Sequence, residues 1–503
     1  MKFFKKKIDD FFEITKRKSS IGVEIFAGIA TFLAMAYILT VNPNSILWQG
    51  ANDPRFASVF IATAIGSFIG CLFMAFMAKM PLATAPGMGL NAMVGSVIGG
   101  AMGYAFSYGN AMLFIFLSGI LFLLLSIIPA GKDKITGEKI SVREKIFEGI
   151  PKCILQSITV GIGLFITFIG LQNAKIIVGN EFTLVSLVDF NTREAWMLGG
   201  PACYAAVALF GLVIITVLSH YKVKGSVIIG IISATILSIP LGVTNLEILK
   251  GTVPGISWNI WENFGNFFSL NPETGGIFAS MIKGGIAIPE GSLMTCVMLI
   301  ISFAMVDTFD TMGTIVGCCQ NAGLMTKEGK PIKYKEIMYA DSISSIIGAF
   351  LGTSTVTVFV ESGAGVAEGG RTGVTALVTA ILFLLSLFLL PLFAFIPSAA
   401  AASALIYVGV LMMKNVVNID FNNIKNAVPS FLTIVIMVLA YSITDGLAMG
   451  IISYVVIDLI IYIIDTIKYK KNPKLKKPTL GINFITIIVL ILFLIYFLVP
   501  TVI

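Results

Sequence analysis

Residues 352–371 read GTSTVTVFVESGAGVAEGGR, and an earlier stretch, residues 81–95, reads PLATAPGMGLNAMVG. In each, a segment that is unsuited to a helix runs into a stretch of small residues, with one polar side chain at the junction: Glu361 in the later stretch and Asn91 in the earlier one. β-Branched residues favour extended backbone in the later stretch, and prolines and glycines interrupt a helix in the earlier one. The two stretches predict a pair of broken membrane helices.

Broken helices at membrane depth point to a binding site. Backbone that is not helical is tolerated in a membrane only where protein buries it or where it lines a cavity. Two such segments in corresponding halves of a chain indicate the substrate site of a transporter, because half-helix N-termini and free backbone groups then face the ligand. The alternative is two re-entrant packing elements without a ligand. The carboxylate of Glu361 favours a site, since burying a charge in an apolar segment is costly without a function.

The rest of the chain has the composition of a membrane protein. It has 503 residues, of which 57% are hydrophobic and 12% charged, which excludes a soluble globule and predicts an all-α polytopic membrane protein. Fourteen spans are expected, with a further apolar run at 480–499 that either crosses the membrane or lies along the bundle. The expected spans are 21–41, 56–78, 82–101, 110–130, 151–171, 200–219, 225–243, 291–314, 338–352, 353–370, 371–396, 398–414, 427–444 and 446–467.

The distribution of positive charge predicts the orientation. If residues 1–20 form a cytoplasmic N-terminal segment, all but five of the 34 Lys and Arg residues fall in the cytoplasmic tail and loops. This asymmetry follows the positive-inside rule and supports fourteen spans with the N-terminus inside. The net charge of +7 is therefore explained by topology, and we expect no nucleic-acid partner.

An internal repeat relates the two halves of the chain. Aligning residues 33–35 with residues 303–305 sets an offset of 270, which pairs an uninterrupted helix with an uninterrupted helix and a broken segment with a broken segment. Two repeats of seven spans are predicted, and an odd number of spans makes the second inverted relative to the first. The offset pairs Asn91 with Glu361, Tyr37 with Asp307, and Thr40 with Asp310.

The span expected at 291–314 carries two acids, Asp307 and Asp310, three residues apart on one helical face. Intramembrane carboxylates usually face a cavity and mark a path for protons, ions or substrate. For Asp310 an equal alternative is a structural bond to the backbone of a broken segment. Phe359 either offers an aromatic face to a ligand or packs in the core, and Asp341 is expected to cap the start of its helix.

Four stretches together resemble a known family: FAGIATFLAMAYILTVNP (26–43), TAPGMGLNAM (84–93), MVDTFDTMGT (305–314) and GTSTVTVFVESGAG (352–365). The sequence is similar over essentially its whole length to the AzgA-like purine permeases, a branch of the nucleobase-ascorbate transporter superfamily with the uracil permease fold. The resemblance implies proton symport of adenine, guanine or hypoxanthine into the cell. It also implies a core domain, formed by residues 21–130 and 291–396, and a gate domain, formed by residues 151–243 and 398–467.

By matching motif, the family's substrate-contacting residues fall on Asn91, Asp307 and Glu361, with Phe359 as a candidate aromatic contact. Asp307, Asp310 and Glu361 are the candidate proton-coupling acids. No cofactor is expected beyond the proton, and no metal, because the six cysteines lack metal-ligand spacing. Expected partners are a purine nucleobase, membrane lipid and a second copy of the chain bound through the gate domain. The expected location is the cell membrane.

Three other functions compete with this interpretation. An anion carrier of the sulfate permease type shares the fold but predicts a basic site. An integral-membrane enzyme is disfavoured because the one histidine, His220, lies at the edge of a span and no Ser or Cys nucleophile has a base beside it in sequence. A channel is disfavoured by the inverted repeat with broken spans, which is typical of alternating access. The sequence leaves open which purine is preferred.

Overall fold

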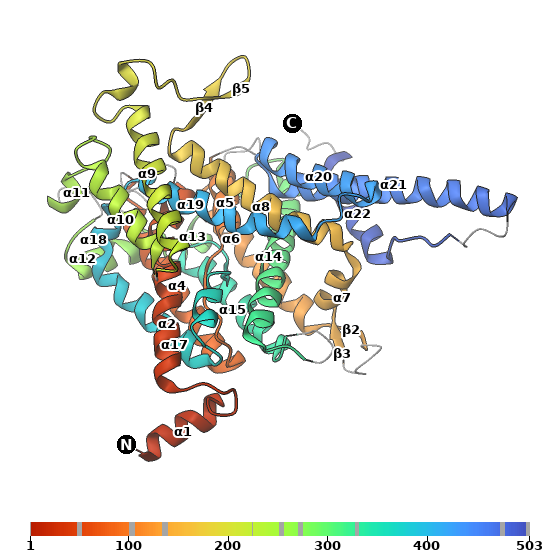
Figure 1. The fold of residues 1–503 in the computed structure, drawn as a ribbon, viewed down its shortest axis with the longest axis horizontal. Helices are drawn as coiled ribbons and strands as arrows, with labels where there is room; N and C mark the ends of the chain where they lie inside the picture. Colours follow the sequence, from red (N-terminus) through yellow and green to blue (C-terminus); the bar gives the residue numbers. More distant parts are fainter. Residues whose placement is uncertain are drawn as a thin grey trace.

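The computed structural model is predominantly helical (Figure 1) and describes residues 2–47, 53–99, 106–132, 139–223, 225–250, 256–269, 275–326, 331–472 and 478–498. Within these ranges, nine helices are long and apolar enough to cross a membrane, and four shorter apolar helices accompany them. The predicted all-α, multi-pass architecture is confirmed, whereas the number of fourteen spans stays a prediction.

One set of helices, the first helix group, packs around two short strands. The strands are β1 (Thr84–Pro86) and β6 (Val356–Val358), and each runs into a short helix, α5 (Met88–Ile98) or α16 (Ser362–Ala367). The surrounding helices are α2 (Ile21–Met35), α3 (Ile38–Leu47), α4 (Phe56–Phe73, extended by the π-helical turn Met74–Ala78), α6 (Tyr108–Ile127), α14 (Leu293–Ala322), α15 (Tyr334–Leu351) and α17 (Gly373–Leu385).

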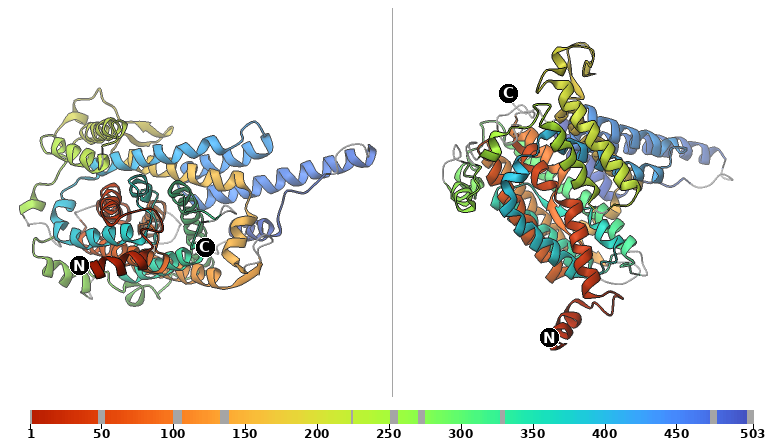
Figure 2. Two further views of the ribbon diagram at one scale, coloured as in Figure 1. Left: turned by 60° about the horizontal axis from the view of Figure 1, so that its bottom comes forward. Right: turned by 60° about the vertical axis from the view of Figure 1, so that its left-hand side comes forward.

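A second helix group packs around α8, which contacts α19 and α20, while α20 also pairs with α21. Figure 2 (left) shows these gold and blue helices lying side by side, whereas the red α2 is seen nearly end-on. Helices α8, α19, α20 and α21 therefore run across the direction of α2 (Figure 1). The second group consists of α8 (Lys152–Asn173), α9 (Pro201–His220), α10 (Ser226–Ser238), α19 (Ser398–Met413), α20 (Ile424–Leu439) and α21 (Ile443–Lys471).

Smaller elements lie outside the two helix groups. A connector between α6 and α8 contains the hairpin of β2 and β3 followed by α7. The remaining elements are α1 (Lys2–Phe12), β2 (Pro129–Lys132), β3 (Lys139–Ser141), α7 (Val142–Gly149), β4 (Ile177–Asn180), β5 (Leu184–Leu187), α11 (Glu247–Lys250), α12 (Ile260–Phe268), α13 (Ser280–Lys283), α18 (Leu390–Ala394) and α22 (Phe484–Leu498), with 3-10 turns at Glu194–Trp196, Ser386–Leu389 and Lys414–Asn418.

The extended stretches predicted in the two broken helices are confirmed as β1 and β6, which pair antiparallel. The register places Pro86 opposite Val356, and these two residues are also equivalent under the offset of 270. In an inverted repeat, a residue lies opposite its own equivalent where the two-fold axis passes between the two strands. Backbone hydrogen bonds from Gly87 to Thr355 and from Phe359 to Ala83, both 3.0 Å, flank the pair and leave Pro86 at a position that needs no N–H.

The first span is not the uninterrupted helix that the repeat alignment assumed. Helix α2 ends at Met35 and α3 begins at Ile38, with a tight turn between them in which Thr40 donates its N–H to the carbonyl of Tyr37 at 3.1 Å. Pro43, which lies inside α3, removes a further helical hydrogen bond. The turn places Tyr37 beside the strand crossing, so that this span also contributes to the candidate site.

The C-terminal apolar run forms α22, which packs on α7 and α21. Thr486 donates to the carbonyl of Gly149 at 2.6 Å, and the N–H of Gly481 donates to Asp458 of α21 at 2.8 Å. Lys425 of α20 forms an ion pair with the same carboxylate. These contacts tie α22 to the bundle, and whether it crosses the membrane stays a prediction.

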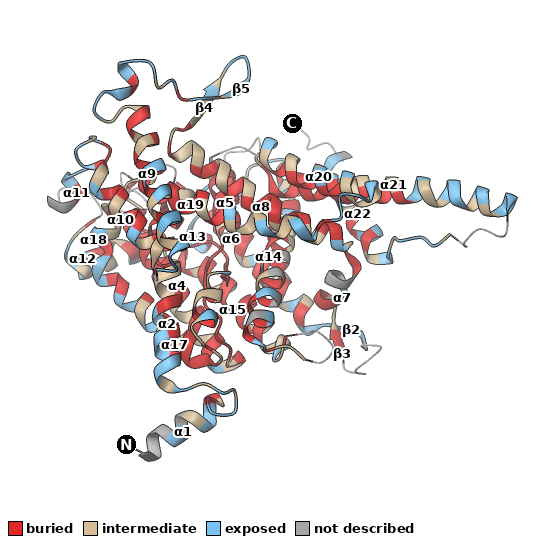
Figure 3. Ribbon diagram, in the orientation of Figure 1, coloured by how far each residue is buried: buried red, intermediate tan, exposed pale blue. Residues whose placement is uncertain are grey.

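Burial separates the interior from an apolar exterior. Figure 3 shows buried residues concentrated where α5, α6, α8, α14 and α15 meet, and exposed residues along the outer helices and the projecting end of α21. Many exposed side chains on α9, α10 and α21 are large and apolar, for example Val213, Ile232 and Ile460. An outer surface of this kind is suited to lipid, as expected for a protein that crosses the membrane several times.

Candidate functional site

The strand crossing holds the N-terminal ends of two half-helices close to each other. Helix α5 begins directly after β1, and α16 begins four residues after β6 ends, with Glu361 as its N-cap residue. The N–H of Ala83 also donates to the hydroxyl of Ser362 at 3.0 Å, which ties the start of α16 to the other half. Half-helix N-termini carry partial positive charge and are suited to polar ligands with acceptor groups.

Glu361 is the principal acid at this crossing. Its Oε1 accepts a hydrogen bond of 2.5 Å from the hydroxyl of Tyr37, and its buried Oε2 has no hydrogen-bond partner. The carboxylate does not cap α16 through a side-chain hydrogen bond, although the sequence placed it at the helix start. The Tyr37 hydroxyl also lies 3.6 Å from the sulfur of Met88, the first residue of α5. Tyr37 therefore links the two half-helices, and one carboxylate oxygen remains available to a ligand.

The structure leaves room beside Glu361. The preceding residue, Val360, is 47% exposed. A Cβ atom built on Gly363, in the first turn of α16, meets nothing within 4 Å, and the same holds for Gly317 on α14. The side of α16 that carries Gly363 is therefore not packed against other protein atoms.

Asn91 lies in α5 with its side chain completely buried. Its Oδ1 accepts a short hydrogen bond from the hydroxyl of Ser354, which belongs to the other half, and its Nδ2 donates to the carbonyl of Pro86 at 3.3 Å. Both functional groups of the amide are thus engaged with protein. In this structure Asn91 holds the two broken segments together, and it does not present a free face as Glu361 does.

Asp307 lies in the interior between α14 and α15 and is 1% exposed. Its Oδ2 is 3.3 Å from the hydroxyl of Ser345, which is also 3.2 Å from the carbonyl oxygen of Val356 in β6. The hydroxyl has one hydrogen and can donate to only one of these acceptors at a time. The Oδ1 atom of Asp307 is buried without a hydrogen-bond partner. Protonation of Asp307 would therefore change which of the two acceptors receives the hydrogen bond from Ser345.

Asp310 approaches the other half of the crossing. Its Oδ2 would lie 3.7 Å from a Cβ atom built on Gly87, the N-cap residue of α5, and the side chain is partly exposed. The two acids expected on one helical face thus point to different neighbours, Asp307 toward α15 and Asp310 toward α5. Asp310 and Glu361 lie near the N-terminal ends of the two half-helices.

Two buried charged residues of this region were missed or misplaced by the sequence. Asp341 lies well inside α15 and does not cap it; its Oδ2 accepts a hydrogen bond of 3.0 Å from Thr311. Arg143, which the sequence counted as a loop cation, has its Nη2 3.6 Å from the same oxygen. Thr311 also shares a short hydrogen bond with Thr357 of β6. Asp341 could have been recognised as a candidate site residue, because it is a third acid in an apolar helix. No feature of the local sequence indicates that the side chain of Arg143 is buried.

Phe359 is 5% exposed and packs in the main hydrophobic core. Of its two alternatives, this conformation fits a packing residue that borders the site. Among the described residues, no group of three His, Cys, Asp or Glu side chains could hold a metal ion.

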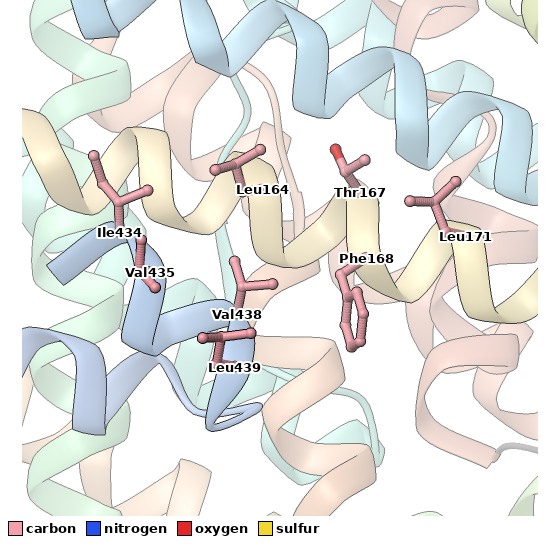
Figure 4. A pocket seen from close by; sticks show the side chains of 8 residues that line it. All are labelled: Leu164, Thr167, Phe168, Leu171, Ile434, Val435, Val438 and Leu439. Atoms are coloured by element: carbon pink, nitrogen blue, oxygen red, sulfur yellow. The ribbon is translucent and has the colours of Figure 1, made fainter. Parts of the chain in front are cut away.

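An apolar groove of about 310 Å³ lies elsewhere, between α8 and α20 (Figure 4). Its one polar side chain, Thr167, already donates to the carbonyl of Gly163 at 2.9 Å. The groove therefore offers no side-chain partner for a polar ligand and is distinct from the crossing. Its lining residues are Leu164, Thr167, Phe168, Leu171, Ile434, Val435, Val438 and Leu439.

Crossed half-helices with acids at their ends, set in an apolar bundle, define a membrane transporter. The profile described as "Permease family" matches residues 22–449, and the chain belongs to this family. It is 35% identical to the adenine permease AdeP of Escherichia coli, over 90% of each chain. It is 37% identical to the guanine/hypoxanthine permease PbuG of Bacillus subtilis, over 88% of this chain and 92% of that one. The resemblance to purine permeases is confirmed, and the enzyme interpretation is excluded.

Solved structures of transporters share the fold. The transmembrane domain of the cyanobacterial bicarbonate transporter BicA superposes with a TM-score of 0.56 at 16% identity, covering 85% of this chain and 97% of that one. The murine anion transporter Slc26a9 in its inward-facing state gives a TM-score of 0.53 at 11% identity, over 88% of this chain and 68% of that one. At these identities the similarity concerns the fold alone.

Proposed function

We propose that this transporter carries purine nucleobases into the cell by proton symport. The relatives named as adenine and guanine/hypoxanthine permeases align with about nine tenths of the chain. The observation that carries the proposal is Glu361, a carboxylate at the strand crossing with one buried oxygen that has no hydrogen-bond partner. A neutral purine has ring and exocyclic N–H donors that such an oxygen accepts.

In this proposal the acids have two roles, contact with the substrate and transfer of protons. Glu361 binds the base, with Asp310 and Asp307 on the side of α14 as further polar contacts. Asn91 orients the site from the opposite half by fixing Ser354 and the end of β1. Phe359 limits the site from the core side. Protons are carried by the buried carboxylates, for which we name Asp307, Asp310 and Glu361 as candidates.

Transport then requires the site to face each side of the membrane in turn. We assign the first helix group to the core domain and the second to the gate domain. At one point of their border, Gly89 of α5 faces two isoleucines of the second group: a Cβ atom built on Gly89 would lie 3.1 Å from Ile443 and 3.4 Å from Ile162. In this proposal the two groups slide against each other while the half-helices stay paired.

The proposal also covers the orientation of the chain in the membrane and its contacts with lipid. The N-terminus lies on the cytoplasmic side of the cell membrane, as the distribution of Lys and Arg predicts. The groove between α8 and α20 is lined by apolar side chains and suits a lipid acyl chain. Dimerisation through the gate domain stays a prediction from the resemblance.

Anion transport is the competing function on this fold. The solved neighbours named as bicarbonate and anion transporters support it only through their shape. The ends of the half-helices here carry Glu361 and Asp310. Acids at this position repel an anionic substrate and suit a neutral base with N–H donors.

Uptake measurements test the proposed function. Radiolabelled adenine, guanine, hypoxanthine and uracil would be supplied to cells that lack their own carriers, with sulfate and bicarbonate as controls. We expect uptake of at least one purine that collapses with a protonophore and with Asp307→Asn. Uptake of a purine that ignores the protonophore would overturn symport, and uptake of an anion alone would overturn the substrate class.

A further inference from the structure

The buried acids have a cation partner that comes from outside the membrane spans. Arg143 lies in the first turn of α7, in the connector between α6 and α8, and its side chain is 1% exposed. Its guanidinium carbon lies 3.2 Å from the ring centre of Phe122, and Nη1 is 3.4 Å from the hydroxyl of Ser126. Nη2 lies 3.6 Å from Oδ2 of Asp341. The fold thus places a positive charge in the interior between α6 and α15.

Several charged groups surround this position. The groups that interact electrostatically with Arg143 are Asp341 and the phenol of Tyr334, both on α15, and Asp307 on α14. Asp310 of α14 and Glu361 of α16 lie beyond them, since Asp310 interacts with Asp341 and with Glu361. From α6 the neighbours are the neutral Phe122 and Ser126, and from β6 the neutral Thr357. The cation acts directly on Asp341 and Asp307, since it interacts electrostatically with both.

The two carboxylates nearest to Arg143 differ in their partners. Asp341 has the guanidinium at 3.6 Å and the hydroxyl of Thr311 at 3.0 Å on its Oδ2, while its Oδ1 has no hydrogen-bond partner. Asp307 shares the single hydroxyl of Ser345 with a backbone carbonyl, and its other oxygen has no hydrogen-bond partner. One buried cation balances one buried carboxylate, and a second ionised carboxylate beside them is strongly disfavoured.

We propose that Arg143 keeps Asp341 ionised and thereby assigns the exchangeable proton of the cluster to Asp307. Arg143 is then a positioning residue, which acts on the transported proton through Asp341 and touches no substrate. This inference rests on the proposed proton symport and identifies which acid carries the proton. The proposal also explains why Arg143, in a connector outside the membrane spans, has a buried side chain. Leaving the guanidinium in water would cost less free energy if it had no role in the interior.

The test is the pH dependence of purine uptake by the full-length protein in proteoliposomes. In Asp341→Asn, Arg143 is left with Asp307 as its acidic partner and favours the ionised form of that acid. We expect half-maximal uptake at an external pH about 1–3 units more acidic than in the wild type. In Arg143→Gln, two acids compete for protons without a cation, and half-maximal uptake moves toward alkaline pH with a lower maximal rate. The double variant should return toward the wild-type profile.

The controls separate a charge role from a packing role. Arg143→Lys keeps the charge and should keep a profile near that of the wild type. If the normalised pH profiles of all variants coincide with the wild-type profile, the inference is wrong and the pair is structural. If Arg143→Gln cannot be purified as folded protein, Asp341→Asn alone decides, because it leaves the arginine in place. Wild-type uptake that is independent of pH and of a protonophore would instead overturn the proposed symport itself.

Discussion

The two broken segments share one backbone design and differ in what their side chains do. In the first half, β1 and α5 present a neutral amide, Asn91, whose groups are both bound to protein. In the second half, β6 and α16 present Glu361, which has one oxygen without a hydrogen-bond partner. The comparison indicates that an inverted repeat can keep one copy as a structural tie and use the other for binding.

The same contrast extends to the helices that flank the segments. Tyr37 and Asp307 are equivalent under the repeat, yet Tyr37 donates to Glu361 across the crossing while Asp307 bonds within its own half. The buried acids beside Asp307 also belong to the second half. We therefore expect substitution of Glu361 in the second broken segment to change transport, and substitution of Asn91 in the first to change mainly stability.

The largest expected effect is that of Glu361→Gln. The variant replaces a charged acceptor by a neutral amide of the same shape, and a hydrogen bond to a charged group contributes about 1.5–3 kcal/mol. Purine affinity should fall by roughly 10- to 150-fold, measured by direct binding to purified protein. Glu368→Gln, at the other end of α16, is the matched control and should bind normally. Equal losses in both variants would mean that Glu361 is no binding residue.

Two glycines of α16 test whether the space beside Glu361 is used. A Cβ atom at Gly365 would lie 2.7 Å from the carbonyl oxygen of Ala27 in α2, so Gly365→Ala should cost about 1–3 kcal/mol of stability, seen as a lower unfolding temperature. Gly363→Ala meets nothing within 4 Å and should fold normally. If purine occupies the space, Gly363→Ala raises the KM for uptake; an unchanged KM would place the ligand elsewhere.

Asn91→Ala examines the structural half. The variant leaves the hydroxyl of Ser354 and the carbonyl of Pro86 without their partner, which should cost about 1–2 kcal/mol of stability. Because Ser354→Ala removes the same contact, the double variant should lose less than the sum of the single losses. Ser96→Ala, whose hydroxyl bonds to its own helix at Ala92, is the control. Strict additivity would show that the two side chains do not act as a tie.

The sequence predicted the parts of this site that local chemistry determines. Interrupted helices follow from prolines, glycines and β-branched residues, and the position of Glu361 at a helix start follows from the same stretch. Tyr37, Asp341 and Arg143 depend on contacts between segments far apart in the chain, such as the 324 residues that separate Tyr37 from Glu361. The repeat offset paired Tyr37 with Asp307, but it could not show that the two side chains have different partners.

The smallest expected effect, that of Ser345→Ala, examines the link between the acids and β6. The serine hydroxyl serves Asp307 and the carbonyl of Val356, and no N–H of β1 can replace it at Val356 because the opposing residue is Pro86. We expect a loss of about 0.5–1.5 kcal/mol in unfolding free energy. Ser344→Ala, whose hydroxyl bonds only within its helix at Ala340, should lose less. If the shared hydroxyl relays protonation of Asp307 to the strand crossing, Ser345→Ala also lowers the number of protons moved per purine, and an unchanged ratio would confine the residue to a packing role.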